Sequence, residues 1–176
     1  MWKMYLVAAV LLAMAGATLL AQRQARDPLT PDQAQQIATA GIDPPGRVHL
    51  YTKFLNEHAD AIKALARRAD TPARNNRLAS ELEDFADLMD ELGSNLDVYS
   101  DRKSDIRKAL KPLDDSIQQW QQMLHDLPSE SAFDLARTDA MDSSNDLADQ
   151  AKQMTHDQDV YFEEHKDQQG QERAVP

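Results

Sequence analysis

Residues 78–127 read LASELEDFADLMDELGSNLDVYSDRKSDIRKALKPLDDSIQQWQQMLHDL and decide the fold. Their apolar side chains recur at alternating steps of three and four residues, in two runs. The first run consists of Leu78, Leu82, Phe85, Met89, Leu92, Leu96 and Tyr99, and the second of Ile106, Leu110, Leu113, Ile117, Trp120, Leu124 and Leu127. This spacing places the side chains of each run on one face of a helix. Both runs therefore predict long helices with coiled-coil-type seams.

The join between the two runs has two interpretations. If the alternating three- and four-residue spacing of the first run is continued past Tyr99, it reaches Lys103 and then Ile106. The two runs therefore share one phase, which favours one continuous helix of about 55 residues. The polar run over 100–104 and Pro112 favour a break instead, because proline costs about 3 kcal/mol in a helix interior. Gly93 is a further candidate helix end. A break near 100–104 yields four helices of similar length, the geometry of an up-down bundle.

Two further apolar stripes flank this region. The stripe before it consists of Val48, Tyr51, Leu55, His58, Ile62, Leu65 and Ala69. The stripe after it lies within a predicted helix of about 131–166 and consists of Phe133, Ala136, Ala140, Ser144, Leu147, Ala151, Met154, Gln158, Tyr161 and His165. Thr71 and Pro72 predict a turn and a helix start between the first two helices. We therefore predict an all-α fold, an antiparallel bundle of four long helices over 48–167, followed by a disordered tail over 168–176. The alternative has three helices, with one continuous central helix.

The N-terminal segment predicts export. Residues 1–21 combine a charged start at Lys3, an apolar run from Met4 and a small-residue site at Ala15-Gly16-Ala17, which is the order of a secretory signal. A second site for cleavage ends at Ala21. The apolar run of 4–21 reaches about 27 Å as a helix, close to the thickness of a bilayer core, so an uncleaved anchor is the alternative. The expected location is periplasmic or secreted, or membrane-anchored by residues 4–21.

Residues 22–47 are rich in Gln, Pro and Ala and predict a tether with one short helix over 31–40. Thr30 suits an N-cap, Pro31 the first helical position and Gln33 the third position of a capping box, while Gly41 ends the helix. Asp43-Pro44-Pro45-Gly46 then predicts a break. The string Leu29-Thr30-Pro31-Asp32-Gln33 also resembles the Leu-Thr-x-x-Gln motif of the Spy and CpxP group of periplasmic helical stress proteins. The resemblance covers five residues, occurs once and implies a chaperone-like role.

Charge and composition restrict the partners. The chain has 19 Lys plus Arg against 30 Asp plus Glu, a net charge of −11, so its field repels nucleic acid and anionic lipid head groups. It contains no cysteine, which excludes disulfides, thiolate metal sites and thiol catalysis. We expect a protein partner and no nucleic acid; a membrane contact is expected only if the N-terminal segment is retained.

The motifs for catalysis and metal binding are missing from the sequence. No histidine follows Glu or Asp by three residues, so the Glu-x-x-His pair of di-iron bundles is excluded. Zinc, nucleotide and acyl-transfer motifs are missing as well. His58 lies on an apolar stripe, where it is either a pH sensor or a core histidine bonded to an acceptor. His165 beside Glu163 and Glu164 is either a weak metal ligand or solvated charge.

Aromatic and charged residues on the helices also have two interpretations each. Phe85 and Trp120 fall on seam positions and indicate core packing rather than a ligand platform. The densest acidic stretch lies within 81–91 and the densest basic stretch within 102–111. A fold at 100–104 is expected to lay these stretches beside each other. The expectation is ion pairing between the two helices, with a basic docking patch for an acidic partner as the alternative.

The sequence thus predicts an exported, non-catalytic helical protein that acts as an interaction, scaffold or chaperone-like module of the bacterial envelope. No catalytic, cofactor-binding or metal-binding residue is assigned, and no cofactor is expected. The alternative is a metal-handling or hydrolytic enzyme whose site assembles from scattered carboxylates and His58. Oligomeric state and biological process do not follow from the residues.

Overall fold

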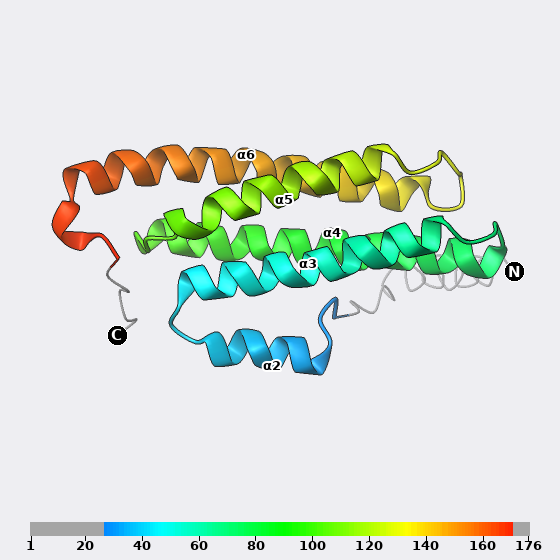
Figure 1. Ribbon diagram of the computed structural model, residues 1–176, viewed down its shortest axis with the longest axis horizontal. Coiled ribbons are helices and arrows are strands. Elements are labelled where there is room, and N and C mark those ends of the chain that lie inside the picture. The colour runs from blue at the N-terminus through cyan, green and yellow to red at the C-terminus, as the bar shows by residue number, and fades with distance from the viewer. Residues whose placement is uncertain (1–26, 171–176) are drawn as a thin grey trace, which may run out of the picture.

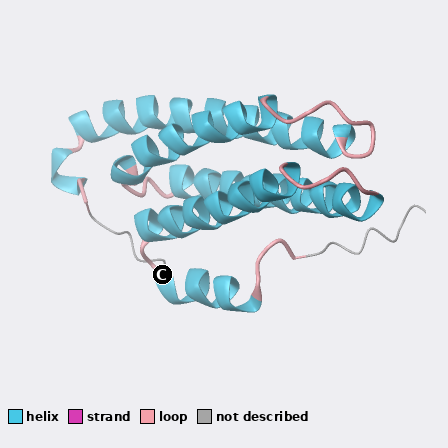
Figure 2. Cartoon of the chain, turned by 45° about the vertical axis from the view of Figure 1, so that its right-hand side comes forward, coloured by secondary structure: helices cyan, strands magenta, loops and turns pink. Residues whose placement is uncertain are grey.

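The computed structural model describes residues 27–170, and within them every regular element is a helix (Figures 1 and 2). The helices are α2 (Pro31–Ala40), α3 (Pro44–Ala66), α4 (Pro72–Asp101), α5 (Arg107–His125) and α6 (Asp134–Glu164), with a short 3-10 helix, η1 (Lys166–Gln168). Helices α3 to α6 form the bundle. The expected signal or anchor segment, residues 1–21, lies outside the described residues.

The four long helices confirm the predicted bundle and show that the continuous central helix was wrong. Helix α4 ends at Asp101 and α5 begins at Arg107. Lys103 adopts a positive φ of 53°, a left-handed conformation that a continuing helix does not contain. The shared phase of the two apolar runs therefore reflects two separate helices that each face the same core.

A buried glutamine holds this turn in place. The side chain of Gln158, on α6, is 6% exposed. Its Oε1 accepts a hydrogen bond from the backbone N–H of Ile106, at 3.1 Å. Its Nε2 donates to the carbonyl of Ser104, at 2.8 Å. One side chain thus satisfies two backbone groups that the helix break leaves without helical partners.

The connection from α4 to α5 crosses the end of the bundle diagonally. Helix α3 packs against α4 and α5, and α6 packs against the same two helices, whereas α4 and α5 occupy opposite corners. Consecutive helices run antiparallel (Figure 1). The diagonal connection consequently makes α3 and α5 parallel neighbours, and likewise α4 and α6.

The core consists of the predicted stripes with few changes. Every apolar residue of the two runs in 78–127 is buried. On α6 the sequence predicted that Tyr161 faces the core after Gln158. The buried residue is instead Phe162, four residues after Gln158, which is 1% exposed. Gly93 does not end a helix but lies inside α4. A Cβ at this position would approach the Gln150 side chain to 3.0 Å, and Gln150 donates a hydrogen bond to the Gly93 carbonyl, so glycine permits the close approach of α6.

The N-terminal part of the described chain packs onto the bundle. Helix α2 occupies the predicted 31–40 and carries the predicted capping box, in which the Thr30 and Gln33 side chains each bond the other's backbone N–H. Leu29 and Ile37 are buried, and α2 lies along α3 (Figure 1). The expected break at 43–46 is shorter than predicted. Asp43 caps α3, and Pro44 already opens that helix, which therefore begins before Val48.

Candidate protein-binding groove

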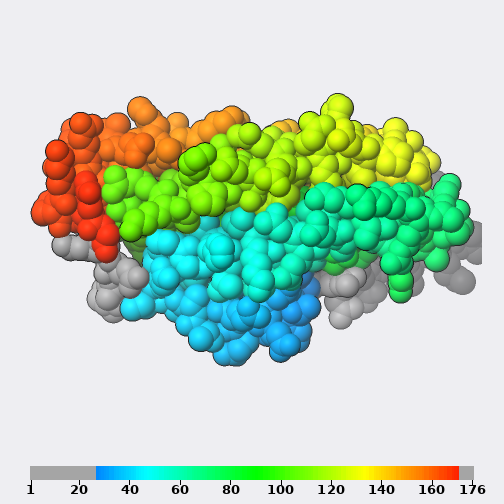
Figure 3. All heavy atoms as spheres, viewed as in Figure 1, coloured from blue at the N-terminus to red at the C-terminus, as the bar shows by residue number. Residues whose placement is uncertain are grey.

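An open groove of about 1000 Å³ lies between the C-terminal part of α3 and the C-terminal half of α5. Figure 3 views the face on which these two helices lie side by side. Helix α3 ends at Ala66 and α5 at His125, and the segment after α5 adds Leu127 and Pro128 to the lining. The last residue of α3 that lines the groove is Ala66, which has a small side chain.

The floor of the groove is apolar. It consists of Ala66 from α3, Met123 from α5, and Leu127 and Pro128 from the following segment. Met123 is 7% and Leu127 8% exposed, so both belong to the core and present only one edge to the groove. Methionine adapts its shape to different contacts, which suits a surface that accepts more than one side chain.

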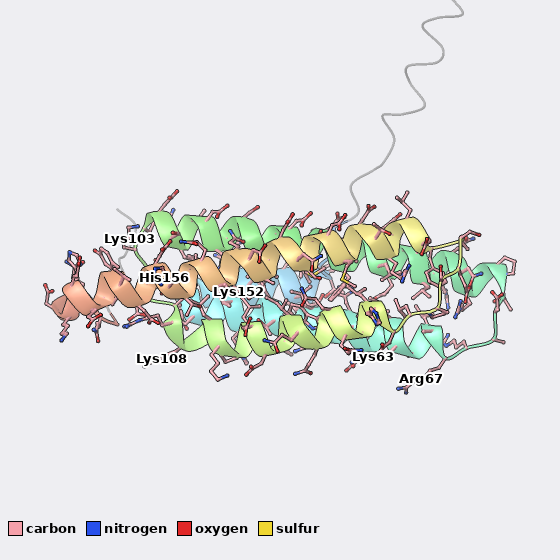
Figure 4. All side chains as sticks on the ribbon, turned by 90° about the horizontal axis from the view of Figure 1, so that it is seen from above. Lys63, Arg67, Lys103, Lys108, Lys152 and His156 are labelled. Atoms are coloured by element: carbon pink, nitrogen blue, oxygen red, sulfur yellow. The ribbon has the colours of Figure 1, made fainter. Side chains whose placement is uncertain are left out.

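The walls of the groove are polar and carry opposite charges. Lys63 and Arg67 stand on the α3 side, and Asp115 and Asp126 on the α5 side. Three exposed glutamines, Gln118, Gln119 and Gln122, lie between the two acids. Figure 4 places Lys63 and Arg67 at the same end of the bundle, away from Lys103, Lys108, Lys152 and His156.

The acids of the α5 wall are bonded within their own helix. Asp115 accepts from Lys111 one turn earlier. Asp126 accepts from Gln122, at 2.8 Å. The Gln122 amide and the neighbouring His125 hold the pKa of the Asp126 carboxyl below its usual range. On the α3 wall, Lys63 pairs with Asp60 at 3.3 Å between exposed groups, a contact that contributes little.

His58 lies at the edge of the core rather than inside it. Its side chain is 13% exposed, and its Nδ1 lies 2.7 Å from Glu81 Oε1 on α4. Burial lowers the pKa of His58, but the hydrogen bond and charge of Glu81, the Pro28 carbonyl and the charge of Asp84 together raise it above its ordinary value. Of the two interpretations made from the sequence, a bonded histidine and a titrating one, this geometry allows both.

His165 and its two glutamates do not converge. The Nδ1 of His165 lies 2.8 Å from the carbonyl of Tyr161, and its ring stacks on the Tyr161 ring at 4.2 Å between centroids. Glu163 and Glu164 are exposed. In residues 27–170, no three His, Asp or Glu side chains are grouped so that they could hold a metal ion.

Trp120 and Phe85 pack in the core, as their seam positions indicate. Both are buried, and their rings meet edge to face with centroids 5.7 Å apart. The indole N–H of Trp120 donates to Asn56 Oδ1 on α3, at 2.8 Å. This bond ties the middle of α3 to the C-terminal half of α5 and satisfies the one polar atom of the tryptophan.

The expected pairing between the acidic stretch of α4 and the basic stretch after it was wrong. Because the α4–α5 connection is diagonal, the two stretches lie at opposite corners of the bundle. The ion pairs of Arg107 and Lys111 are instead local. Arg107 pairs with Asp105 and stacks over the Phe162 ring, and Lys111 pairs with Asp115. On α4, Glu91 accepts from the Tyr51 hydroxyl and Glu81 from His58, both on α3.

Two positioning residues could not be found from the sequence. Gln158 holds the α4–α5 turn, as described above. Arg74 is 6% exposed and holds the opposite end of the bundle. Its guanidinium donates to the carbonyls of Leu65 and Ala66 at the end of α3 and to the carboxylate of Glu130 in the segment before α6. The Arg74 group thereby fixes the segments that border the groove.

None of the helices in residues 27–170 combines the length and the apolar character that a membrane crossing requires. Comparisons with protein-family models, curated proteins and solved structures find no match to this chain.

Proposed function

We propose that this protein is a non-catalytic binding module of the bacterial envelope, which acts as a scaffold or chaperone-like protein and holds a segment of another polypeptide in the α3–α5 groove. The groove carries this proposal. Its apolar floor of Ala66, Met123, Leu127 and Pro128 suits apolar side chains of a bound segment. The exposed glutamine amides of α5 offer donors and acceptors to a polypeptide backbone.

The form of the groove favours a polypeptide over a small molecule. Small-molecule sites bury most of their ligand in an enclosed pocket, whereas this groove of about 1000 Å³ is open along two helices. Its oppositely charged walls favour a segment with a fixed orientation, whose acidic side chains face Lys63 and Arg67. Charge complementarity of this kind selects the partner more than it adds affinity.

The envelope location rests on residues 1–21. Cell fractionation combined with N-terminal sequencing tests it. We expect a mature chain that begins after Ala17 or Ala21 in the periplasm or the medium. Intact chain in the membrane fraction selects the anchor of residues 4–21, and intact chain in the soluble cytoplasm contradicts the location.

Site-specific photo-crosslinking tests the groove. A photoreactive residue at Gln119 lies in the groove, and one at Asp149 lies on exposed α6 as a matched control. We expect a discrete adduct from position 119 that position 149 does not give. The adduct partner, once purified, is expected to bind the wild type and the Asp149→Trp variant but not Gln119→Trp, which fills the groove. Equal adducts from both positions, or equal binding by both tryptophan variants, contradict the proposal.

A further inference from the structure

The walls of the α3–α5 groove offer few partners to the backbone of an extended segment. Both walls are helices, whose N–H and C=O groups bond within the helix. The described residues 27–170 contain no strand, so no sheet edge borders the groove. Of the three glutamine amides, Gln118 Nε2 already donates to Asp114, and Gln122 Nε2 to Asp126. An extended segment along the groove would therefore leave most of the backbone groups that face the floor without a partner.

The lining also disfavours two other kinds of peptide segment. Polyproline segments dock on aromatic side chains, and none of the lining residues is aromatic. Phosphorylated segments require clusters of arginine, whereas this groove has one arginine, Arg67, and two acids, Asp115 and Asp126, on the opposite wall. A helix differs from all these segments because it bonds its own backbone and presents one apolar stripe. The apolar floor of the groove suits such a stripe.

The two helices beside the groove set a direction for a bound helix. Helices α3 and α5 are parallel neighbours, and both end at the groove, at Ala66 and His125 (Figure 1). A helix carries partial negative charge at its C-terminal end. The carbonyls of Leu65 and Ala66 accept hydrogen bonds from Arg74, whereas Asp126 adds a further negative charge at the end of α5. The partially positive N-terminus of a bound helix is therefore favoured at this end, so that the bound helix runs antiparallel to α3 and α5.

The charged walls add a pattern along the bound helix. Trp120 of α5 bonds Asn56 of α3, which relates the levels of the two helices. Lys63 lies seven residues beyond Asn56, and Asp126 lies six residues beyond Trp120, so the two charges stand at a similar level. Asp115 precedes Asp126 by eleven residues, which is about 16 Å along a helix. An antiparallel helix that starts beside Lys63 reaches the level of Asp115 about three turns later.

We propose, on the basis of the function proposed above, that the groove binds an amphipathic helix of a partner protein that lies antiparallel to α3 and α5, with acidic residues in its first turn and basic residues about three turns later. The acidic residues face Lys63 and Arg67, and the basic residues face Asp115. The present contacts of these walls, Lys63 with Asp60 and Asp115 with Lys111, join exposed groups and are exchanged at little cost.

Binding of three synthetic peptides to the full chain tests the proposal. The first peptide, of about fifteen residues, has an apolar stripe at steps of three and four residues, glutamates in its first turn and lysines in its last. The second has the same composition with the glutamates and lysines exchanged. The third keeps the order of the first but carries two central prolines, which prevent a helix. Fluorescence anisotropy is expected to show that the first peptide binds at least about tenfold more tightly than either of the others.

Matched charge changes separate the groove from the net charge of the protein. The double variant Lys63→Glu/Arg67→Glu should lose the preference for the first peptide over the second. The double variant Lys108→Glu/Lys152→Glu makes the same change in net charge at the other end of the bundle and should keep the preference (Figure 4). All four residues are exposed, and circular dichroism verifies that both variants fold. An equal loss of preference in both double variants overturns the proposal.

The Gln119→Trp variant distinguishes failure of the bound helix from failure of the groove. Tight binding of the third peptide, or equal binding of the first and second, overturns a bound helix of this direction. If Gln119→Trp abolishes the binding of all three peptides in that case, the groove still holds a polypeptide and the proposed function stands. Peptide binding that Gln119→Trp leaves unchanged contradicts both. If the first peptide shows no saturable binding, the helix is overturned, and the adduct from position 119 tests the proposed function separately.

Discussion

Single side chains with several partners fix the connections of this bundle. Arg74 shows why such a residue is effective. The guanidinium group has five N–H donors in a rigid plane, and here they bond two carbonyls at the end of α3, the side chain of Asn75 and the carboxylate of Glu130. Its plane also lies over the Phe133 ring, 5.6 Å from the centroid. One residue thus joins the end of α3, the start of α4 and the start of α6.

Replacing this arginine should destabilise the protein strongly. We expect Arg74→Ala to lower the free energy of unfolding by about 3 kcal/mol, because the carbonyls and the carboxylate lose a buried, charged donor. Urea denaturation monitored by circular dichroism measures the change. Arg74→Lys should recover only part of it, since an ammonium group lacks the planar fork.

Two exposed arginines near the same turn provide the comparison. Arg68 and Arg77 face solvent, and their replacement by alanine should change the free energy of unfolding by less than about 0.5 kcal/mol. A loss of similar size for Arg74→Ala and Arg68→Ala would mean that the buried contacts contribute no more than surface charge does.

The sequence predicts the helices of this bundle well and their connections poorly. The periodic apolar residues of 78–127 suffice to locate α4 and α5, because burial of one face is a local property of each helix. The turn between them depends on Gln158, which lies more than fifty residues further along the chain. No local pattern contains that information, which explains why a continuous helix and a turn fitted the same residues.

The groove was unpredictable for the same reason. It lies between helices that the sequence does not pair. The groove requires that α3 and α5 be parallel neighbours, a result of the diagonal connection. His58 was recognised as unusual from its place on an apolar stripe. Its bonded partner, Glu81 on the next helix, follows only from the three-dimensional arrangement.

Replacement of Gln158 tests whether this side chain holds the α4–α5 turn. Gln158→Ala should lower the free energy of unfolding by about 2 kcal/mol, since the N–H of Ile106 and the carbonyl of Ser104 both lose a buried partner. Gln153→Ala on the same helix removes an exposed amide that bonds only Asp157 one turn later, and should be nearly silent. Equal effects of the two changes, measured by thermal unfolding, argue that the turn holds without Gln158.

The seams of α4 and α5 provide a second test. Leu82 is 0% and Leu110 1% exposed, so an aspartate at either position places a charge in the core. We expect Leu82→Asp and Leu110→Asp each to cost more than about 4 kcal/mol and to abolish cooperative unfolding. Asp87→Ala changes an exposed residue of α4 and should retain the wild-type melting temperature. Calorimetry distinguishes these outcomes, and a cooperative transition in both aspartate variants would contradict a core at these seams.

The chain carries a net charge of −11. Among the described residues, ion pairs such as Lys111 with Asp115 and Arg137 with Asp134 join residues within four positions of each other. Arg74 with Glu130 and His58 with Glu81 join separate segments. The excess of carboxylates therefore leaves a net repulsion between helices that the local ion pairs do not offset.

This imbalance predicts how salt affects stability. Ions screen exposed charges over about 8–10 Å at 0.1–0.15 M ionic strength, so they weaken the repulsion between helices more than the short local pairs. We expect the melting temperature at pH 7.5 to rise by several degrees between 0.01 M and 0.3 M sodium chloride. The increase should be larger than that produced by sucrose at equal osmolality, which does not screen charge. If stabilising ion pairs dominated instead, salt would lower the melting temperature. A fall with sodium chloride, or an equal rise with sucrose, would therefore show that repulsion between the helices does not limit the stability of this bundle.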